Sequence, residues 1–326
     1  MALRPNAHHL QRDLSRFQAR LTFRDLWNAA DKSSAQRIQI LDNTTGTPSL
    51  VLTALPTEPG LQLSNTEFVI MLRQYLSMPL EPVLGLIPTK RIRCCCSERF
   101  GPRNEVCHGN HLFNCSQQSA FSQRHEAVKA VVQECYKSAG IIAEVERPVM
   151  SAPLVTEKGK RINLKRYDIW APSPDYVGKN YCIDITIVSH VSKEHFEKAT
   201  ETVLHNANHA VTDKSAKYRK EIQHDTEVFV PLCAQSNGAL HKHFGVLFAQ
   251  LGERVNGLPP LHANWASPTF EAYWLQRTSC AIWRETARGL LRISAASNRL
   301  AGHVLPSIRP AGYSDPESDQ PSLSDA

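Results

Sequence analysis

The segment that most constrains the fold is residues 181–188, which read YCIDITIV. It is short, apolar and rich in β-branched residues, a composition that is typical of a β-strand. Because side chains alternate along a strand, its three isoleucines share one face, whereas Asp184 and Thr186 share the other. An acid within so apolar a strand is costly to bury unless a cation or hydrogen-bond donors compensate it. We therefore expect a strand whose carboxylate requires a partner.

The residues around this strand predict an α/β fold. Residues 120–138 form a helical pattern with Val128, Val131, Val132 and Cys135 on one stripe, and Gly140 fits as its stop. Further strands are predicted at 141–148, 162–170 and 227–232, and further helices at 192–223, 239–255 and 268–298. This alternation favours a mixed central sheet flanked by helices.

The remaining segments are predicted to be helical, cysteine-rich or loosely ordered. Residues 66–76 favour an amphipathic helix with Phe68, Met71, Leu72 and Leu76 on one face, and three prolines then interrupt regular structure. The first twenty residues lack periodicity, and the acidic tail predicts disorder. We expect these segments: 1–90, a helical connector, partly disordered at its start; 91–118, a cysteine knuckle; 119–258, the sheet domain; 259–300, a helical extension; 301–326, a disordered tail.

The knuckle concentrates five of the nine cysteines between Cys94 and Cys115, which favours a metal site over a disulfide scaffold. Two thiolates on a tight turn and a histidine–cysteine pair one helical turn apart can close a tetrahedron around zinc. The expected ligands of this structural Zn²⁺ are Cys94, Cys96, His111 and Cys115, with Cys95, Cys107 and His108 as spare candidates. The alternative is a loop of reduced thiols.

A second candidate site consists of two carboxylates. Asp168 lies near the end of the predicted strand 162–170. If that strand pairs with 181–188 as an antiparallel hairpin, Asp168 and Asp184 can meet at one edge of the sheet. Together they could hold Mg²⁺, which favours oxygen ligands, polarises a phosphodiester and helps to activate water. The alternative is that Asp184 pairs with a nearby lysine or arginine and Asp168 merely ends a strand.

Basic residues precede this pair, although the formal net charge of +6 is mild. They could grip a nucleic-acid backbone or form a solvated hairpin edge. These residues are Lys158, Lys160, Arg161, Lys165 and Arg166. No run of eighteen apolar residues and no secretory signal occurs, so we expect a soluble, intracellular protein without a membrane partner.

Several motifs occur in an order that resembles the C-terminal region of reverse-transcriptase polyproteins of non-long-terminal-repeat retrotransposons, which ends in a restriction-like endonuclease. The motifs, covering roughly residues 45–300, are LGLIP (84–88), the CxC…HxxxC knuckle, Arg124-His125, Tyr167-Asp168, DITIV (184–188), Lys217-Tyr218 and FVPL (229–232). Each motif alone is weak, but the shared order is moderately specific.

The resemblance implies the PD-(D/E)xK nuclease fold, with Asp168 and Asp184 binding Mg²⁺ or Mn²⁺. The chain departs from that pattern at three positions. Tyr167 replaces the proline, and Thr186 replaces the lysine, so a positive charge must come from elsewhere. Lys217, or Lys214 one turn earlier, could supply it. Glu126 stands where the family usually has asparagine.

That glutamate could donate a third metal oxygen, or it could simply favour the N-terminal end of a helix. Arg124 is expected to contact nucleic acid. The resemblance thus implies a phosphodiester hydrolase that nicks target DNA, with RNA as a second possible partner and the nucleus as its location. No Y-x-D-D motif is present, so the chain is not a reverse transcriptase by itself. The alternatives are a catalytically decayed nucleic-acid-binding remnant and a zinc-dependent protein-interaction domain.

Overall fold

The computed structural model describes residues 7–30, 35–78, 80–84, 113, 115, 120–149, 166–192, 194–223, 225–260 and 267–300. Its centre is a four-stranded mixed sheet in the order β1-β2-β3-β4. The strands are β1 (Glu144–Pro148), β2 (Arg166–Pro172), β3 (Asn180–Val188) and β4 (Glu227–Gln235). β2 pairs antiparallel with both β1 and β3, whereas β3 and β4 are parallel. The predicted mixed sheet and the predicted antiparallel hairpin are both confirmed.

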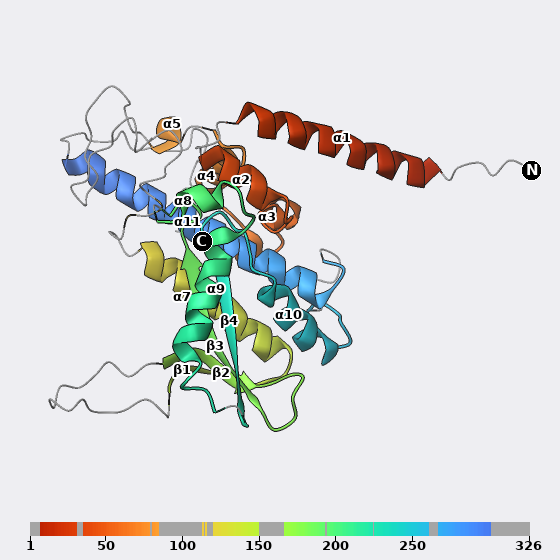
Figure 1. Ribbon diagram of the computed structural model, residues 1–326, viewed down its shortest axis with the longest axis vertical. Coiled ribbons are helices and arrows are strands. Elements are labelled where there is room, and N and C mark those ends of the chain that lie inside the picture. The colour runs from red at the N-terminus through yellow and green to blue at the C-terminus, as the bar shows by residue number, and fades with distance from the viewer. Residues whose placement is uncertain are drawn as a thin grey trace, which may run out of the picture.

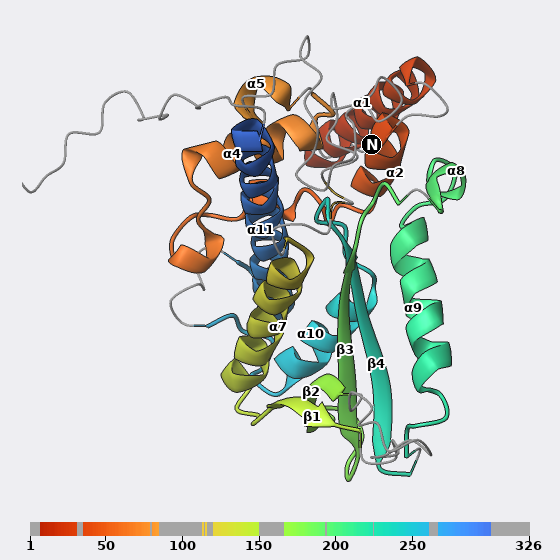
Figure 2. The same cartoon turned by 90° about the vertical axis from the view of Figure 1, so that its left-hand side faces the viewer.

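Helices cover both faces of the sheet (Figure 2). One face carries α7 (Ala120–Ser138) and α10 (His243–Glu253), with the long α11 (Phe270–Leu300) packed against both helices. The other face carries α9 (His205–Tyr218), preceded by the short α8 (Phe196–Ala199). The predicted helical region 192–223 is therefore two helices.

The bounds of α7 match the predicted helix, and the stripe that predicted it is buried against the sheet. Gly140 follows with a φ of +72°, a left-handed conformation that glycine adopts without strain. Val132 of this stripe shares a core with Ile183 and Ile185 of β3. The isoleucine face of β3 therefore points to α7, as the alternation predicted, and Asp184 points to the opposite layer, where α9 lies.

The N-terminal part is helical from Ala7 onward. Its elements are α1 (Ala7–Ala29), α2 (Ala35–Asn43), α3 (Leu50–Thr53), the 3₁₀ turn η1 (Pro59–Leu61), α4 (Asn65–Tyr75) and α5 (Glu81–Leu84). α1 extends away from the rest of the molecule (Figure 1). The first twenty residues, in which the sequence shows no periodicity, are therefore helical from Ala7 on. Among its described side chains, α1 exposes Phe17 and Leu26 and buries few apolar residues. Its sequence therefore has no clear apolar stripe from which the helix could be predicted.

The predicted helix at 66–76 forms as α4, but the predicted buried face is wrong. Met71 is buried, whereas Phe68 and Leu76 are exposed. The residues that α4 buries are Glu67, Ile70, Met71 and Gln74. Two sets of residues in this segment have helical spacing, and packing against α11 decides between them. Glu67 is buried because it closes a capping box with Ser64 and binds Arg288 of α11 at 2.6 Å.

One hydrophobic core crosses the predicted segment boundaries. It joins Val51 and Met71 of the connector, Ile185 of the sheet and Trp283 of the predicted extension. Trp283 Nε1 donates to the carbonyl oxygen of Pro48 at 3.2 Å. The indole also lies against Gly238, where an added Cβ would sit 2.4 Å from Nε1. The connector and the C-terminal helix are therefore packed parts of the sheet domain.

A buried carboxylate in α2 makes the same connection with polar contacts. Asp42 accepts hydrogen bonds from Gln235 Nε2 at 2.9 Å, from Asn237 Nδ2 at 2.8 Å and from the backbone nitrogen of Leu204 at 3.0 Å. Burial outweighs these donors and raises the pKa of Asp42 to about 6. The residue thus links the connector to the end of β4 and to the start of α9.

None of the described helices combines the length and the apolar character needed to cross a membrane. The predicted tail at 301–326 lies outside the described residues.

Candidate functional site

Asp184 lies in the middle of β3, and α9 supplies most of its partners. The residue is 5% exposed. Its Oδ2 lies 2.7 Å from Lys214 Nζ and accepts from the Thr186 hydroxyl at 3.2 Å, while Oδ1 accepts from the Tyr218 hydroxyl at 3.0 Å. Lys214 and Tyr218 are four residues apart, so both side chains lie on one face of α9. The buried charge is compensated by a cation and by hydroxyl donors.

Asp168 lies on β2 where the β2–β3 ladder ends. The last pair at this end joins Ile169 to Ile183, and one further step in that register would set Asp168 opposite Asp184. Instead, the Asp168 side chain replaces a backbone acceptor, because its Oδ2 accepts from the backbone nitrogen of Ile185 at 2.6 Å. The carboxyl group of Asp168 therefore reaches the residue that directly follows Asp184.

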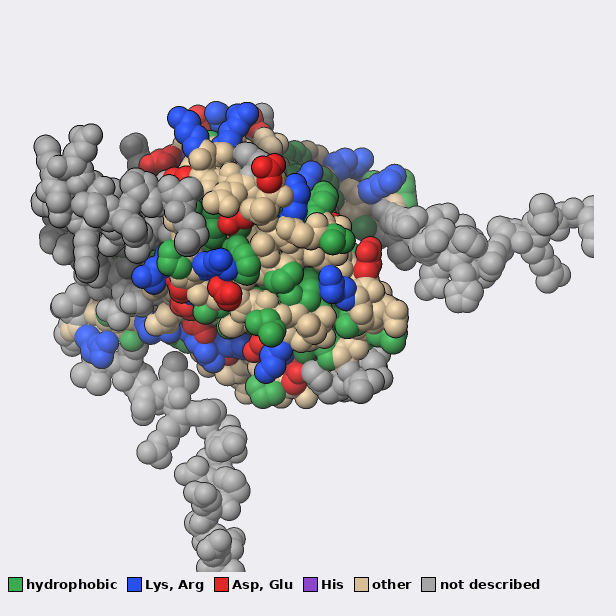
Figure 3. All heavy atoms as spheres, turned by 90° about the horizontal axis from the view of Figure 1, so that it is seen from below, with side chains coloured by type: hydrophobic (Ala, Val, Ile, Leu, Met, Phe, Trp, Pro, Cys, Tyr) green, Lys and Arg blue, Asp and Glu red, His purple; other side chains and the backbone are tan. Residues whose placement is uncertain are grey.

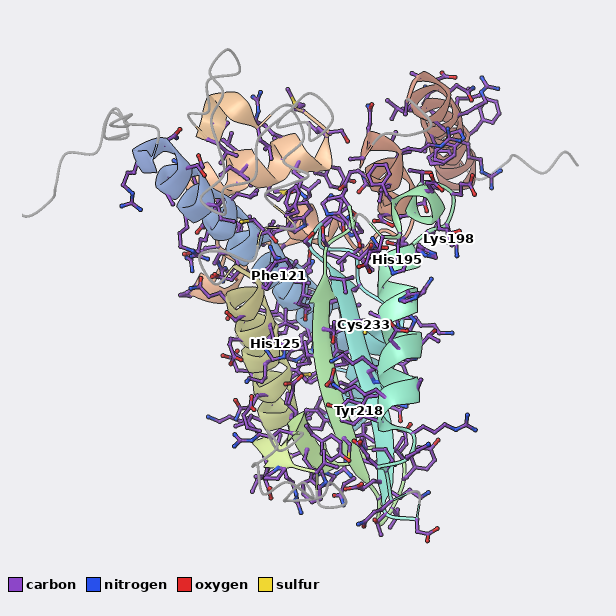
Figure 4. The ribbon with its side chains drawn as sticks, turned by 60° about the vertical axis from the view of Figure 1, so that its left-hand side comes forward. Phe121, His125, His195, Lys198, Tyr218 and Cys233 are labelled. Atoms are coloured by element: carbon purple, nitrogen blue, oxygen red, sulfur yellow. The ribbon has the colours of Figure 1, made fainter. Side chains whose placement is uncertain are left out.

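The two aspartates receive their other partners from opposite layers. His125 Nε2 lies 3.0 Å from Asp168 Oδ2, and His125 belongs to α7. Figure 4 shows His125 and Tyr218 on elements that flank β3 from its two sides. The hydrogen bond with Asp168 raises the pKa of His125, despite partial burial. α7 thus holds one carboxylate while α9 holds the other.

The Tyr218 hydroxyl lies between the two aspartate environments. Besides its bond to Asp184, it lies 3.4 Å from the carbonyl oxygen of Arg166, two residues before Asp168. Burial, and then the negative charge of Asp184, raise the pKa of Tyr218, and Asp168 adds to that effect. Tyr167 packs on the Tyr218 ring with centroids 5.8 Å apart and is buried. The aromatic side chain of Tyr167 therefore supports the tyrosine that binds Asp184.

The lysine beside Asp184 is Lys214 and not Lys217. Lys217 is exposed, and its Nζ lies 5.3 Å from the Tyr218 ring centroid. The buried residues of α9 include Ala207, Ala210 and Tyr218, and Lys214 continues their spacing of three and four residues. That stripe is the signal in the sequence that could have selected Lys214.

Glu126 does not contact either aspartate. Its side chain is 59% exposed and bonds to Lys129 Nζ at 2.8 Å. His125 lies between Glu126 and Asp168, because its Nδ1 lies 3.2 Å from Glu126 Oε1 while its Nε2 bonds to Asp168. Lys129 also binds Glu146 of β1 at 2.5 Å. Sequence reasoning placed His125 in a motif without a role, and it missed Lys129 and Glu146 because no spacing rule links α7 to β1.

The predicted nucleic-acid contacts are only partly described. Arg166 is exposed at the start of β2, whereas Lys158, Lys160, Arg161 and Lys165 lie outside the described residues. Arg124 is 2% exposed, so its guanidinium is not at the surface, where the predicted nucleic-acid contact would require it. On the face seen from below, acidic and basic side chains are interspersed and form no single-sign patch among the coloured residues (Figure 3).

Of the predicted zinc ligands, only Cys115 is described, and it is buried in a cluster with Phe113. Cys94, Cys96 and His111 lie outside the described residues, as do the spare candidates. The zinc knuckle therefore stays a prediction.

The oxygen ligands that the two aspartates offer are of the kind that a hard cation prefers, but they are few. Two carboxylates supply the oxygen ligands that Mg²⁺ prefers, and Mg²⁺ retains several waters in its coordination shell. Asp168 Oδ1 makes no hydrogen bond to a described residue, so this oxygen can accept a ligand. In the part of the chain that the structure describes, no three histidine, cysteine or acidic side chains are grouped closely enough to hold a metal. A cation here would therefore rest on the two aspartates and water.

Comparison with models of known protein families finds no match, and comparison with curated proteins finds no similar sequence.

Proposed function

We propose that the chain is a divalent-metal-dependent DNA endonuclease that nicks its target, and that Asp168, Asp184 and Lys214 carry the chemistry. One observation supports this above all: the carboxyl group of Asp168 reaches the backbone nitrogen of Ile185, beside Asp184, at the end of the β2–β3 ladder. Two carboxylates and a lysine beside the end of the β2–β3 ladder form a set that serves phosphodiester hydrolysis. On this proposal the protein acts in the nucleus.

Each residue has a role that follows from its contacts. Asp168 and Asp184 would hold Mg²⁺ or Mn²⁺, which supplies polarisation of the phosphodiester and a more acidic water. Lys214 neutralises Asp184 in the metal-free protein, and its ammonium can stabilise negative charge that develops on the phosphate. His125 fixes the orientation of the Asp168 carboxyl group. Tyr218 does the same for Asp184.

The second candidate is a nucleic-acid-binding module that does not cleave. It is favoured by the surroundings of Asp184, because both carboxylate oxygens already have protein partners. In that case the ion pair with Lys214 would be structural, and no metal would displace it.

A plasmid-nicking assay separates the two candidates. The protein is incubated with supercoiled DNA and Mg²⁺ or Mn²⁺, and the variants Asp168→Asn and Asp184→Asn are compared with wild type. We expect loss of nicking by about 10³-fold in both variants, since each loses a charged metal ligand. Asp213→Asn is the matched control, because Asp213 is exposed on α9, the helix that carries Lys214, and pairs with His209.

The result that contradicts the proposal is wild-type protein that binds DNA in a salt-dependent manner and leaves it intact with every metal. That result supports the binding module, provided that Asp168→Asn binds DNA equally well.

A further inference from the structure

The strongest unexplained feature outside the aspartate site is a pair of arginines whose guanidinium edges are buried. Arg124 lies on α7 and Arg292 on α11, two helices that pack side by side (Figure 2). In each guanidinium, the atoms Nε and Nη2 are buried and have no hydrogen-bond partner among the described residues. A buried charge is normally paired, because its desolvation is otherwise uncompensated.

The unpaired atoms form the edge that recognises oxyanions. Nε and Nη2 lie on the same side of a guanidinium and donate two parallel N–H groups, the geometry of bidentate binding to carboxylate or phosphate. The face of the Arg124 guanidinium is occupied, since its carbon lies 4.9 Å from the centroid of the Phe121 ring. The Nε–Nη2 edge is the part that has no partner among the described residues.

Among the described residues, no carboxylate is ion-paired with either guanidinium, although the charge of Glu285 raises the pKa of Arg124. Burial, and then the charge of Arg292, lower the pKa of Arg124 to about 10, which still leaves it charged at neutral pH. Burial and the charge of Arg124 lower the pKa of His190 to about 3, so this imidazole is neutral and adds no negative charge. Glu285 faces the same region, but its Oε1 is bound to Arg288 Nη1 at 2.8 Å.

We propose that the Nε–Nη2 edges of Arg124 and Arg292 form a binding site for inorganic phosphate between α7 and α11. Phosphate carries enough charge and enough acceptor oxygens to pair with both edges, whereas one carboxylate fills a single edge. A nucleic-acid strand is disfavoured, because Arg124 is only 2% exposed. Arg292 is half-buried, so it is the more exposed of the two arginines. The site is independent of the proposed nuclease function.

The test is thermal unfolding of the full chain in inorganic phosphate, with sodium chloride of equal ionic strength as the reference. About 10 mM phosphate should raise the melting temperature by about 3 °C or more, because ligand binding to the folded state stabilises it. Sulfate should act similarly, and acetate should not. Asp184→Asn should respond like wild type, which separates this site from the nuclease site.

Arg292→Gln should abolish the phosphate shift, while Arg299→Gln, an exposed arginine on the same helix, should retain it. Should Arg292→Gln fail to fold, Arg292→Lys keeps the charge but loses the planar edge, and it should weaken phosphate binding at least about tenfold by calorimetry. The proposal is overturned if phosphate stabilises wild type no more than chloride does. It is also overturned if acetate or a short oligonucleotide matches phosphate, or if Arg292→Gln responds like wild type.

Discussion

The two helical layers that cover the sheet differ in how they are held, and each supports one half of the candidate site. The layer of α7, α10 and α11 buries large apolar side chains, including Trp283 and Phe248. The layer of α9 buries mainly small residues, such as Ala207 and Ala210, and places Lys214 and Tyr218 on Asp184. The first layer therefore determines most of the stability, whereas the second layer carries more of the charged chemistry.

This difference indicates which helix can move relative to the sheet. A helix attached by small residues can shift over the sheet at little packing cost, because few dispersion contacts are lost. We call the layer of α7, α10 and α11 the thick layer and the layer of α9 the thin layer. Asp168 is held by His125 of the thick layer, and Asp184 is held by Lys214 of the thin layer. Movement of α9 would thus alter Asp184 without displacing Asp168.

The largest expected effect on stability comes from the thick layer. Trp283→Ala should lower the free energy of unfolding by about 3–5 kcal/mol, since it leaves a cavity in the shared core. In the thin layer, Ala207→Gly should cost only about 1 kcal/mol, mainly through helix propensity. Urea denaturation measures both, with Phe17→Ala on the exposed α1 as a control expected within about 0.5 kcal/mol. Equal losses in the two layers would abolish the contrast.

The next effect concerns the lysine of the thin layer. Lys214→Met should reduce nicking about 10²-fold, because it removes the cation beside Asp184. It should also destabilise the protein by about 2–4 kcal/mol, since a buried carboxylate loses its charge partner. Lys217→Met, one turn along the same helix, should behave like wild type in both assays. A larger loss of nicking and stability in Lys217→Met than in Lys214→Met would mean that α9 presents Lys217, and not Lys214, to Asp184.

A smaller effect is expected at the tyrosine. Tyr218→Phe keeps the packing with Tyr167 and removes the hydroxyl that donates to Asp184. We expect a loss of about 1.5–2 kcal/mol in the free energy of unfolding, the range for a hydrogen bond to a charged group. Combining it with Lys214→Met should give less than the sum, because both residues bind one carboxylate. Additive losses in a double-mutant cycle would show that the two contacts are independent.

The smallest effect depends on pH and tests the thick layer. The folded-state pKa of His125 is raised above its ordinary value of 6.5, mainly by the hydrogen bond with Asp168. The stabilisation is therefore fully present below about pH 6.5 and is lost as pH rises through the folded-state pKa. His125→Gln should be less stable than wild type at acidic pH, and the difference should shrink above neutrality. A stability difference between wild type and His125→Gln that grows with pH would show that protonated His125 does not stabilise the fold through Asp168.

Local patterns predicted the elements with one clear buried stripe. The α7 helix and the β2–β3 hairpin follow from residues such as Val132 and Ile185, whose spacing fixes the buried face. α4 shows the limit, because Phe68 and Ile70 both belong to helical patterns and only packing against α11 selects Ile70. Spacing gives the type of element, while tertiary contacts decide its orientation.

The candidate site shows the same limit. Asp168 and Asp184 could be expected close together in advance, since one further step of the antiparallel register beyond Ile169 and Ile183 would set them opposite each other. The choice of Lys214 over Lys217 depends on the rotation of α9, which its small buried residues set. Arg124 shows a different limit, because a basic residue in a motif suggests a surface contact, whereas this side chain lies in the interior. Nothing in the sequence near Arg124 indicates α11, which begins more than 140 residues further along the chain.

The three donors around Asp42 bear on how far this chain can be shortened. A fragment that starts at residue 119 would retain the predicted sheet domain but would leave Gln235, Asn237 and the Leu204 amide facing an empty position. It would also uncover Trp283, whose indole donates to Pro48. A fragment that begins at Ala35 keeps all of these partners. That residue, and not the start of the apparent sheet domain, is therefore an N-terminal boundary at which a recombinant version should remain folded.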